Sequence, residues 1–262
     1  MFDFHIHTDI SFDGRMTPEA ALRYAEKNGL SEICFTDHYD HNSKKELEHF
    51  LFDIEDYKRA YEHLSSPTAK IRKGVEFGLT DWNVHELRAL AESYPFDFVI
   101  GSVHYVREGV DVYFKEYWEG KTPEKAARTY LLQTLDCVRL HDGFDVLGHI
   151  NYLSKSPANP THKPIAYKDH ADIVDEIFKT LIQKGIGIEV NTSGFDRVGY
   201  FLPDRAYLVR FRELGGEIVT VGSDAHDDFR VGKYTHAAVE LVASVFGHVC
   251  TFEDRKPIFH KL

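Results

Sequence analysis

Short apolar runs recur along this chain, and residues that can bind metals follow most of them. Seven such runs have the length of a β-strand, and they lie at residues 2–6, 33–36, 71–75, 98–103, 146–148, 186–190 and 218–222. Stretches with apolar residues at helical spacing lie between them, at residues 44–64, 84–92, 123–141, 169–184, 203–214 and 234–246. This alternation of strand and helix patterns favours a parallel sheet built from β/α units.

Residues at the ends of the stretches support these boundaries. Thr17 can cap a first helix whose first turn holds Pro18, and Gly29 ends it. Residues 249–252 have the pattern of one further strand. A chain of 262 residues suits one large α/β domain or two small ones. Because the alternation continues without a linker, we expect a parallel β/α barrel that forms a single domain over residues 1–262.

Ligand residues stand at the ends of the predicted strands. In a β/α barrel these ends meet at one face, where such enzymes build their active sites. The residues placed there are His5, His7, Asp37, His38, Glu76, His104, His149, Asn191, Asp224 and His226. Imidazoles and carboxylates gathered in one small volume indicate a site for several metal ions. The sequence therefore predicts a metal-dependent hydrolase.

Spacing within two short segments strengthens this interpretation. His5 and His7 are two residues apart on a strand, so their side chains face the same side and can hold one ion. Asp3 shares that face and could orient one of the imidazoles. Asp224 and His226 repeat the spacing after the last strand of the barrel, which neighbours the first strand if the barrel closes.

Composition excludes several other classes of protein. The net charge of −11 argues against a nucleic-acid surface, which needs clustered Lys and Arg. The cysteines, Cys34, Cys137 and Cys250, are too widely spaced for a disulfide framework or a Cys-rich zinc site. No apolar run reaches the ~18 residues of a membrane span, and the N-terminus lacks the features of a signal peptide. We expect a cytoplasmic protein that binds neither membranes nor nucleic acid.

The motifs taken together resemble the PHP (polymerase and histidinol phosphatase) superfamily. They are Asp3-x-His5-x-His7-Thr8, Thr36-Asp37-His38, Gly74-Val75-Glu76, Ser102-Val103-His104, Gly148-His149 and Gly222-Ser223-Asp224-Ala225-His226. The segments 189–194 (Glu-Val-Asn-Thr-Ser-Gly) and 101–105 (Gly-Ser-Val-His-Tyr) are similar to the histidinol-phosphate phosphatase branch. This resemblance implies a distorted (β/α)7 barrel, similar to a TIM barrel, that holds three divalent metal ions at the C-terminal ends of its strands.

The resemblance also implies a ligand set. The first ion would be held by His5, His7, Glu76 and Asp224, and Glu76 would bridge to a second ion held by His104 and His149. His38 and His226 would hold the third ion. Its remaining ligand is His in some members of the family, and here the matching loop offers Asp13. This change could weaken the third site or alter its metal preference, and the mixed ligands are compatible with Zn, Mn or Fe. We expect Asp37 to lie behind the ligands.

A phosphorylated substrate needs cations beyond the metals. Arg197, in the loop after the sixth strand, matches the position of a phosphate-binding arginine in phosphatases of the family. The planar fork of a guanidinium suits a phosphoryl group. Lys155 and His162, in the loop after the fifth strand where relatives can use another arginine, and Arg230 are further candidates.

Within this family, the expected reaction is hydrolysis of a small phosphate monoester, L-histidinol phosphate, in histidine biosynthesis. A hydroxide that bridges the metal ions would attack the phosphorus, and Arg197 would stabilise the charge that develops. Asp224, His226 and metal-bound water are the candidates that would give the leaving alkoxide its proton. Two alternatives remain open at this stage: a phosphoesterase that acts on nucleotides or nucleic-acid ends, and a non-catalytic metal-binding module. The oligomeric state is not indicated by the sequence.

Overall fold

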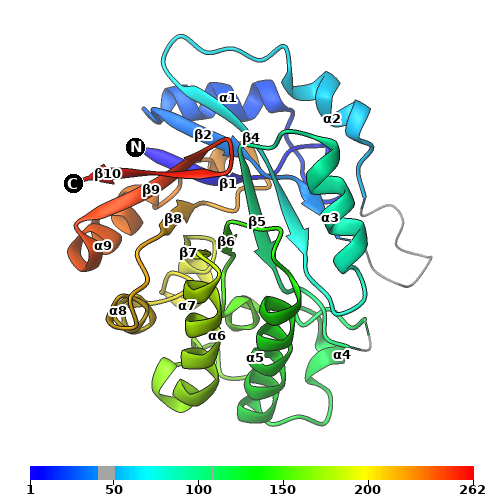
Figure 1. Cartoon of the computed structure of the whole chain (residues 1–262), viewed down its shortest axis with the longest axis vertical. Helices are drawn as coiled ribbons and strands as arrows, with labels where there is room; N and C mark the ends of the chain where they lie inside the picture. The colour runs from blue at the N-terminus through cyan, green and yellow to red at the C-terminus, as the bar shows by residue number, and fades with distance from the viewer. Residues whose placement is uncertain (41–50, 108) are drawn as a thin grey trace.

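A nearly closed barrel of parallel strands forms the centre of the molecule (Figure 1). The computed structural model describes residues 1–40, 51–107 and 109–262. In spatial order the strands are β1 (Phe2–Ile6), β2 (Glu32–Phe35), β4 (Lys70–Gly78), β5 (Phe98–Ser102), β6 (Val146–Leu147), β7 (Gly187–Asn191) and β8 (Val219–Gly222). Each strand pairs in parallel with the next one in this order. The predicted seven-stranded β/α barrel is confirmed.

The seam between β8 and β1 closes through a few backbone contacts. Ile6 forms an isolated parallel bridge with Ala225. The N–H of His7 donates to the carbonyl of Ala225 at 2.9 Å, and the N–H of Asp224 donates to the carbonyl of His5 at 2.8 Å. These bonds bring the His-x-His segment at the start of the chain against the Asp-x-His segment near its end.

The second strand of the barrel is broken into two pieces. β2 pairs with the first half of β4, and the two-residue strand β3 (His38–Tyr39) pairs with the second half. The intervening Asp37 accepts a hydrogen bond at its carbonyl from the N–H of Glu76, at 3.1 Å. This register sets His38 directly beside Glu76.

Helices connect the strands and surround the barrel (Figure 1). They are α1 (Pro18–Lys27), α2 (Ile54–Tyr61), α3 (Val84–Ser93), α4 (Lys115–Trp118), α5 (Pro123–Leu140), α6 (Ala171–Gln183), α7 (Phe195–Val198), α8 (Arg205–Glu213) and α9 (Thr235–Phe246), with 3-10 turns η2 (Tyr152–Lys155), η3 (Tyr167–Asp169) and η4 (Asp228–Arg230).

Of the helix expected at residues 44–64, the described part of the chain contains Ile54–Tyr61. Residues 41–50 lie outside the described part of the chain. In the described segment that begins at residue 51, the side chain of Asp53 accepts hydrogen bonds from the N–H groups of Glu55 and Asp56. This capping starts α2 at Ile54, because the carboxylate satisfies backbone donors that the first turn leaves free.

The strand expected at 249–252 exists, but it lies outside the barrel. It is β9 (His248–Glu253), which pairs antiparallel with β10 (Lys256–Lys261). Phe252 packs with Phe4 and Phe98 in a separate apolar cluster. Arg255, in the turn of the hairpin, bonds the carboxylate of Asp145 just before β6. The hairpin therefore covers the N-terminal end of the barrel, opposite the face where the predicted ligands gather.

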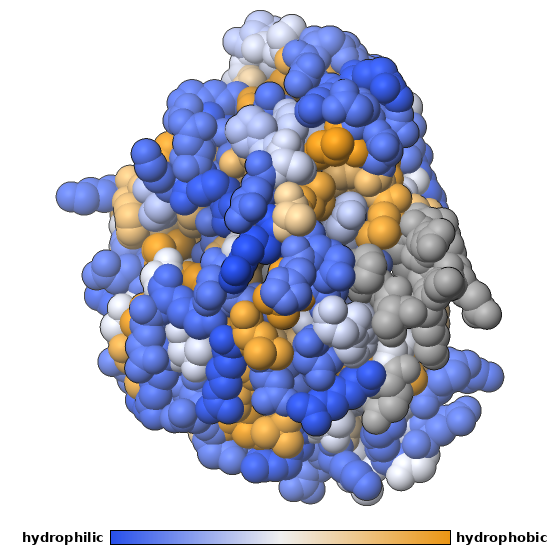
Figure 2. Space-filling view, turned by 45° about the vertical axis from the view of Figure 1, so that its right-hand side comes forward, coloured by the Kyte–Doolittle hydropathy of each residue, from blue (hydrophilic) through white to orange (hydrophobic). Residues whose placement is uncertain are grey.

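The outer surface is predominantly hydrophilic on the face shown in Figure 2, with hydrophobic residues in small groups. Among the helices that the structure describes, none is long and apolar enough to cross a bilayer.

Candidate metal centre

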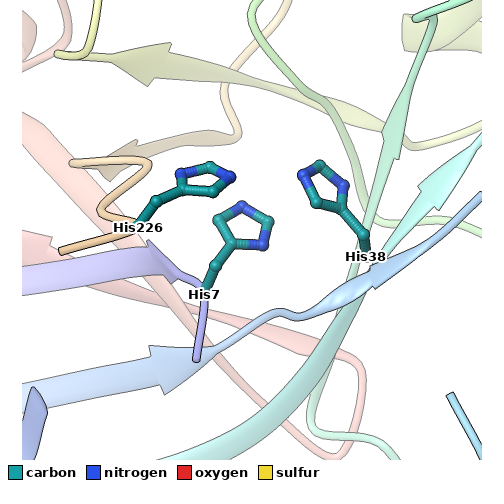
Figure 3. Close-up of side chains that lie close together, drawn as sticks. All are labelled: His7, His38 and His226. Atoms are coloured by element: carbon teal, nitrogen blue, oxygen red, sulfur yellow. The ribbon is translucent and has the colours of Figure 1, made fainter. Parts of the chain in front are cut away.

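Three histidines turn their imidazole rings toward one another at the C-terminal end of the barrel (Figure 3). His7 follows β1, His38 begins β3, and His226 lies in the loop after β8. The ring centroids of His38 and His226 lie 4.1 Å and 4.2 Å from that of His7. One nitrogen of each ring lies within 4.8 Å of the others, so the three side chains could hold a metal ion.

Glu76 lies between two sets of imidazoles and is fully buried. Its Oε2 is 2.9 Å from Nδ1 of His38 and 3.2 Å from Nε2 of His5. Its Oε1 is 3.0 Å from Nε2 of His149 and 3.5 Å from Nε2 of His104. A carboxylate with one oxygen facing each set has the arrangement that a bridging ligand needs.

Charges in this cluster depend strongly on one another. Burial opposes ionisation of Glu76, but His5, His38 and His104 together hold its pKa well below the usual range. Burial would likewise lower the pKa of His38, yet Glu76 and Asp13 raise it to about 9. In the absence of metal, protonated imidazoles therefore compensate the buried carboxylates.

Several buried atoms in the cluster have no hydrogen-bond partner, among them Nε2 of His5, Nε2 of His7 and Oε2 of Glu76. Such atoms are costly unless a ligand satisfies them. Each nitrogen lies 3.2–3.5 Å from Oε2 of Glu76, and Oδ1 of Asp224 lies 3.3 Å from Nε2 of His7. A tetrahedral ion with ligands at ~2.0–2.1 Å places those ligands roughly 3.3 Å apart. The donor set therefore fits a divalent ion.

Asp13 comes together with the histidines it was expected to join. Its Oδ2 is 3.2 Å from Nε2 of His226 and 3.8 Å from Nε2 of His38. Partial burial works against ionisation, but His38 and His226 keep the pKa of Asp13 well below its ordinary value. With 40% of its side chain exposed, Asp13 lies at the mouth of the cluster.

Asp224 is held at both of its carboxylate oxygens. Oδ2 accepts from Nζ of Lys155 at 2.6 Å and from the hydroxyl of Ser193 at 2.9 Å, while Oδ1 faces His5 and His7. Burial alone would raise its pKa, but Lys155 and His5 hold the pKa well below the usual range. Asp224 therefore stays ionised, as a metal ligand must.

A cavity of about 630 Å³ opens above the cluster. The long loops at residues 105–122 and 152–168 contribute Tyr105, Asp111, Tyr113, Phe114, Tyr152 and Lys155 to its lining. These two loops therefore overhang the cluster.

The residues expected to bind phosphate differ in their positions. Lys155, Arg197 and Arg230 line the cavity. Nη1 of Arg197 donates to the carbonyl of Lys155 at 3.4 Å, and its guanidinium lies over the ring of Tyr113 at 5.4 Å. Arg230 is already paired with Asp196 at 3.1 Å. His162 is exposed and lies outside the lining of the cavity. Its loop turns away after Asn159, whose carbonyl accepts the N–H of His162.

Comparison with known proteins places the chain in a family. The sequence model of the PHP domain matches residues 3–193. A probable histidinol-phosphatase of Clostridium acetobutylicum is 33% identical over 255 residues, which cover 97% of this chain and 98% of that protein. The chain belongs to the PHP domain family. The histidinol-phosphatase of Lactococcus lactis is 32% identical over 261 residues, covering 97% of this chain and 95% of the relative.

Two solved structures agree with the barrel described above. The crystal structure of histidinol phosphate phosphatase from L. lactis, complexed with zinc, L-histidinol and phosphate, superposes with a TM-score of 0.88. The two sequences are 30% identical in that alignment, which covers 98% of each chain. A second structure, from Listeria monocytogenes, has a TM-score of 0.74 at 17% identity and supports the fold alone.

Two carboxylates of this PHP domain contact imidazoles from behind, a role that was not predicted for them. Oε1 of Glu189 is 2.6 Å from Nδ1 of His5, and Oδ2 of Asp40 is 2.7 Å from Nδ1 of His104. Such contacts fix the tautomer and the orientation of a ligand imidazole. Glu189 had one available signal, because it is an acidic residue inside an otherwise apolar strand.

The expectation that Asp3 orients an imidazole of the PHP site is wrong. Its carboxylate accepts the N–H groups of Ser223 at 2.8 Å and Gly232 at 2.7 Å. Asp3 thereby joins the first strand to the loops after β8.

The expectation for Asp37 is met, because its carboxylate lies behind the proposed ligands. It accepts a hydrogen bond from the hydroxyl of Ser11, whose oxygen is 3.2 Å from Nδ1 of His7.

Proposed function

We propose that this protein is a metal-dependent phosphatase that hydrolyses L-histidinol phosphate to L-histidinol and phosphate. The observation that carries the proposal is the buried carboxylate of Glu76, which lies among imidazoles from several strand ends beneath an open cavity. Support for the substrate comes from the L. lactis relative, whose structure contains zinc, L-histidinol and phosphate.

Three divalent ions, of Zn, Mn or Fe, would be held by the side chains already described. His5, His7, Glu76 and Asp224 would hold the first ion, and Glu76 with His104 and His149 would hold the second. His38, His226 and Asp13 would hold the third. When bound, such ions supply a water of lowered pKa and offset the charge of the phosphoryl group.

The protein's own cations would position the phosphate. Lys155 has its Nζ at the cavity wall, hydrogen-bonded to Ser193 at 2.8 Å as well as to Asp224. The guanidinium of Arg197 lies over the ring of Tyr113, a contact that favours one position of its fork. Preorganised charges of this kind stabilise the transferring phosphoryl group without reorganising during the reaction.

The leaving alkoxide needs a proton, and Asp224 is poorly suited to supply it. A carboxyl group whose pKa is held low by Lys155, against the opposing effect of burial, has no proton to give near neutral pH. His226 has its Nδ1 3.1 Å from the carbonyl of Asp224, so Nε2 is the nitrogen turned toward Asp13. Because Nε2 would bind the third ion and Nδ1 faces the backbone, His226 is also poorly placed to give the proton, which would then come from metal-bound water.

A panel of substrates tests this proposal. The purified protein should release phosphate from L-histidinol phosphate with a higher kcat/KM than from nucleoside monophosphates or an aryl phosphate, and metal analysis should find about three ions per chain. A preference for nucleotides would replace the proposed substrate with a nucleotide or nucleic-acid end. Bound metal without phosphate release from any ester would indicate a non-catalytic module.

A further inference from the structure

A chain of hydrogen-bonded side chains runs from helix α2 to the metal centre. It starts at the hydroxyl of Tyr61, the last residue of α2, which donates to Oδ2 of Asp37. Oδ1 of Asp37 accepts from the hydroxyl of Ser11 at 2.9 Å, and the oxygen of Ser11 is 3.2 Å from Nδ1 of His7. All four side chains are buried. They form a continuous path from an outer helix to one of the proposed ligands.

The protons available in this chain determine which nitrogen of His7 carries hydrogen. A serine hydroxyl has a single proton, and that of Ser11 goes to Asp37. The oxygen of Ser11 also accepts the N–H of His38 at 2.9 Å, so toward the imidazole it acts only as an acceptor. Nδ1 of His7 must therefore be the donor, which leaves Nε2 with a free lone pair. This Nε2 finds no hydrogen-bond partner among the described residues, and a metal ion would occupy that position.

The carboxylate of Asp37 has donors at both of its oxygens. Besides Ser11, the backbone N–H of Thr8 donates to Oδ1 at 2.7 Å. The hydroxyl of Thr8 lies 3.3 Å from Oδ2, and the hydroxyl of Tyr61 is the closer donor to that oxygen. Ser11 and Thr8 belong to the loop after β1, whereas Tyr61 belongs to the outer layer of helices. Tyr61 therefore ties the orientation of this carboxylate to the position of α2.

Ring packing fixes where the hydroxyl of Tyr61 lies. The ring of Tyr61 stacks on that of Phe35 in β2, with centroids 4.7 Å apart, and it lies 4.6 Å from the ring of Tyr57, one helical turn earlier. Tyr57 is also buried, but its hydroxyl donates to the carbonyl of Gly74 at 2.8 Å. The two tyrosines of α2 are thus alike in burial and in bonding through the hydroxyl, and of the two it is Tyr61 that reaches the chain ending at His7.

We propose that the hydroxyl of Tyr61, acting through this chain, positions His7 so that its Nε2 is free to bind a metal ion. Tyr61 is thereby a positioning residue, because Asp37 and Ser11 lie between it and the imidazole. The inference rests on the proposed function for the metal centre, but it does not depend on which ester is hydrolysed. It gives helix α2 a part in metal binding that its distance from the ligands does not indicate.

Tyr61→Phe tests the proposal, since it removes the hydroxyl and keeps the ring. We would strip the protein of metal and measure its affinity for Zn²⁺ by competition with a chelator. The affinity should fall by about 10-fold or more for at least one bound ion, because loss of a group that orients a metal ligand typically costs 10- to 100-fold. Tyr57→Phe is the matched control, since it removes one buried hydroxyl and one hydrogen bond from the same helix. Both variants should lower the Tm of the metal-free protein to a similar extent, but Tyr57→Phe should change zinc affinity by less than about threefold.

Ser11→Ala interrupts the same chain at its other end. It should weaken zinc binding by about 10- to 100-fold. The double variant Ser11→Ala/Tyr61→Phe should bind zinc no more weakly than Ser11→Ala alone, because both substitutions break one path. Losses that add fully in the double variant would overturn the inference, as would a loss below about threefold in Tyr61→Phe or an equal loss in Tyr57→Phe.

These measurements contain no substrate, so they separate the inference from the proposed function. If the variants behave as expected but the wild type does not hydrolyse L-histidinol phosphate, the proposed function fails and the role of Tyr61 stands. If the wild type hydrolyses the ester but the two tyrosine variants bind zinc equally well, the role of Tyr61 fails and the proposed function stands. A wild-type protein that binds no divalent ion would overturn both.

Discussion

At the scale of single residues, Glu76 combines complete burial with contacts from both of its oxygens to imidazoles. If it joins two ions, Glu76→Gln should lower metal content and turnover together, because the amide removes a charged ligand from both sites. Elemental analysis and kcat, measured on the same preparation, test this expectation. Glu92→Gln, on the exposed surface of α3, is the matched control. Full metal content with full activity in Glu76→Gln would remove Glu76 from the proposed site.

Asp13 is the proposed ligand that departs from the family's pattern. Asp13→Ala should lose roughly one ion while the other two remain, since Asp13 contacts only His38 and His226 among the proposed ligands. Asp13→His should keep the full metal content, because imidazole is an equally competent ligand. Metal stoichiometry by elemental analysis decides between these outcomes. An unchanged count in the alanine variant would make Asp13 an ordinary carboxylate of the cavity mouth.

Arg197 distinguishes a phosphatase from other metal-dependent hydrolases. Arg197→Ala should lower kcat/KM for phosphate esters by roughly 10²–10³, which corresponds to about 3–4 kcal/mol for one preorganised charged contact. Arg197→Lys should recover only part of this loss, because an ammonium cannot reproduce the planar fork. Metal content should stay unchanged in both variants. A loss below about threefold in Arg197→Ala would leave phosphate binding to Lys155 and Arg230.

At the scale of the elements, the β9–β10 hairpin supports the barrel from below. Phe252 is buried against Phe4 and Phe98, with ring centroids 4.9 Å apart in the pair with Phe98. Phe252→Ala should lower the free energy of unfolding by about 3–5 kcal/mol, because it removes a large buried ring. Phe259→Ala, on the other strand of the hairpin, is the control, since Phe259 is 47% exposed. Denaturant unfolding of both variants checks the prediction, and equal effects would contradict it.

The sequence predicts the strands of the barrel well, but it predicts the contacts between distant elements less well. The runs at β1 and β8 end in proposed metal ligands, so one pattern predicts both the strand and the role of the residues at its end. The hairpin is different, because its pairing with the barrel depends on contacts such as those of Phe252 with Phe4, which no local pattern encodes. The roles of Glu189 and Asp40 could not be predicted from the sequence, for the same reason. Each role depends on which imidazole lies opposite the carboxylate in three dimensions.

At the scale of the whole molecule, the buried charges couple metal binding to pH. Burial lowers the pKa of His38, but Glu76 and Asp13 outweigh it and raise the pKa from 6.5 to about 9. In the metal-free protein this shift contributes stability that is fully present below pH 6.5 and is lost as the pH rises through about 9. Metal ions need the neutral imidazole, so their affinity should increase over the same interval.

Thermal unfolding of metal-free and metal-loaded protein tests this coupling. The Tm of the metal-free protein should fall between pH 6.5 and 9, while the gain in Tm from a fixed concentration of Mn²⁺ should grow. His38→Gln should flatten part of this pH dependence. A gain in Tm that does not change with pH would contradict the proposed competition between protons and metal.

The seam between β1 and β8 has a consequence for how the protein is made. Asp3 accepts the N–H of Ser223 across a separation of 220 residues, and Asp224 faces His5 across the same seam. A chain leaving the ribosome would therefore present His5 and His7 long before their partners exist. Metal captured by such a chain would be bound weakly and exchanged easily. Once the last β/α unit docks, the same ions would tie the first and last strands together, so that tight metal retention would mark a completely synthesised barrel.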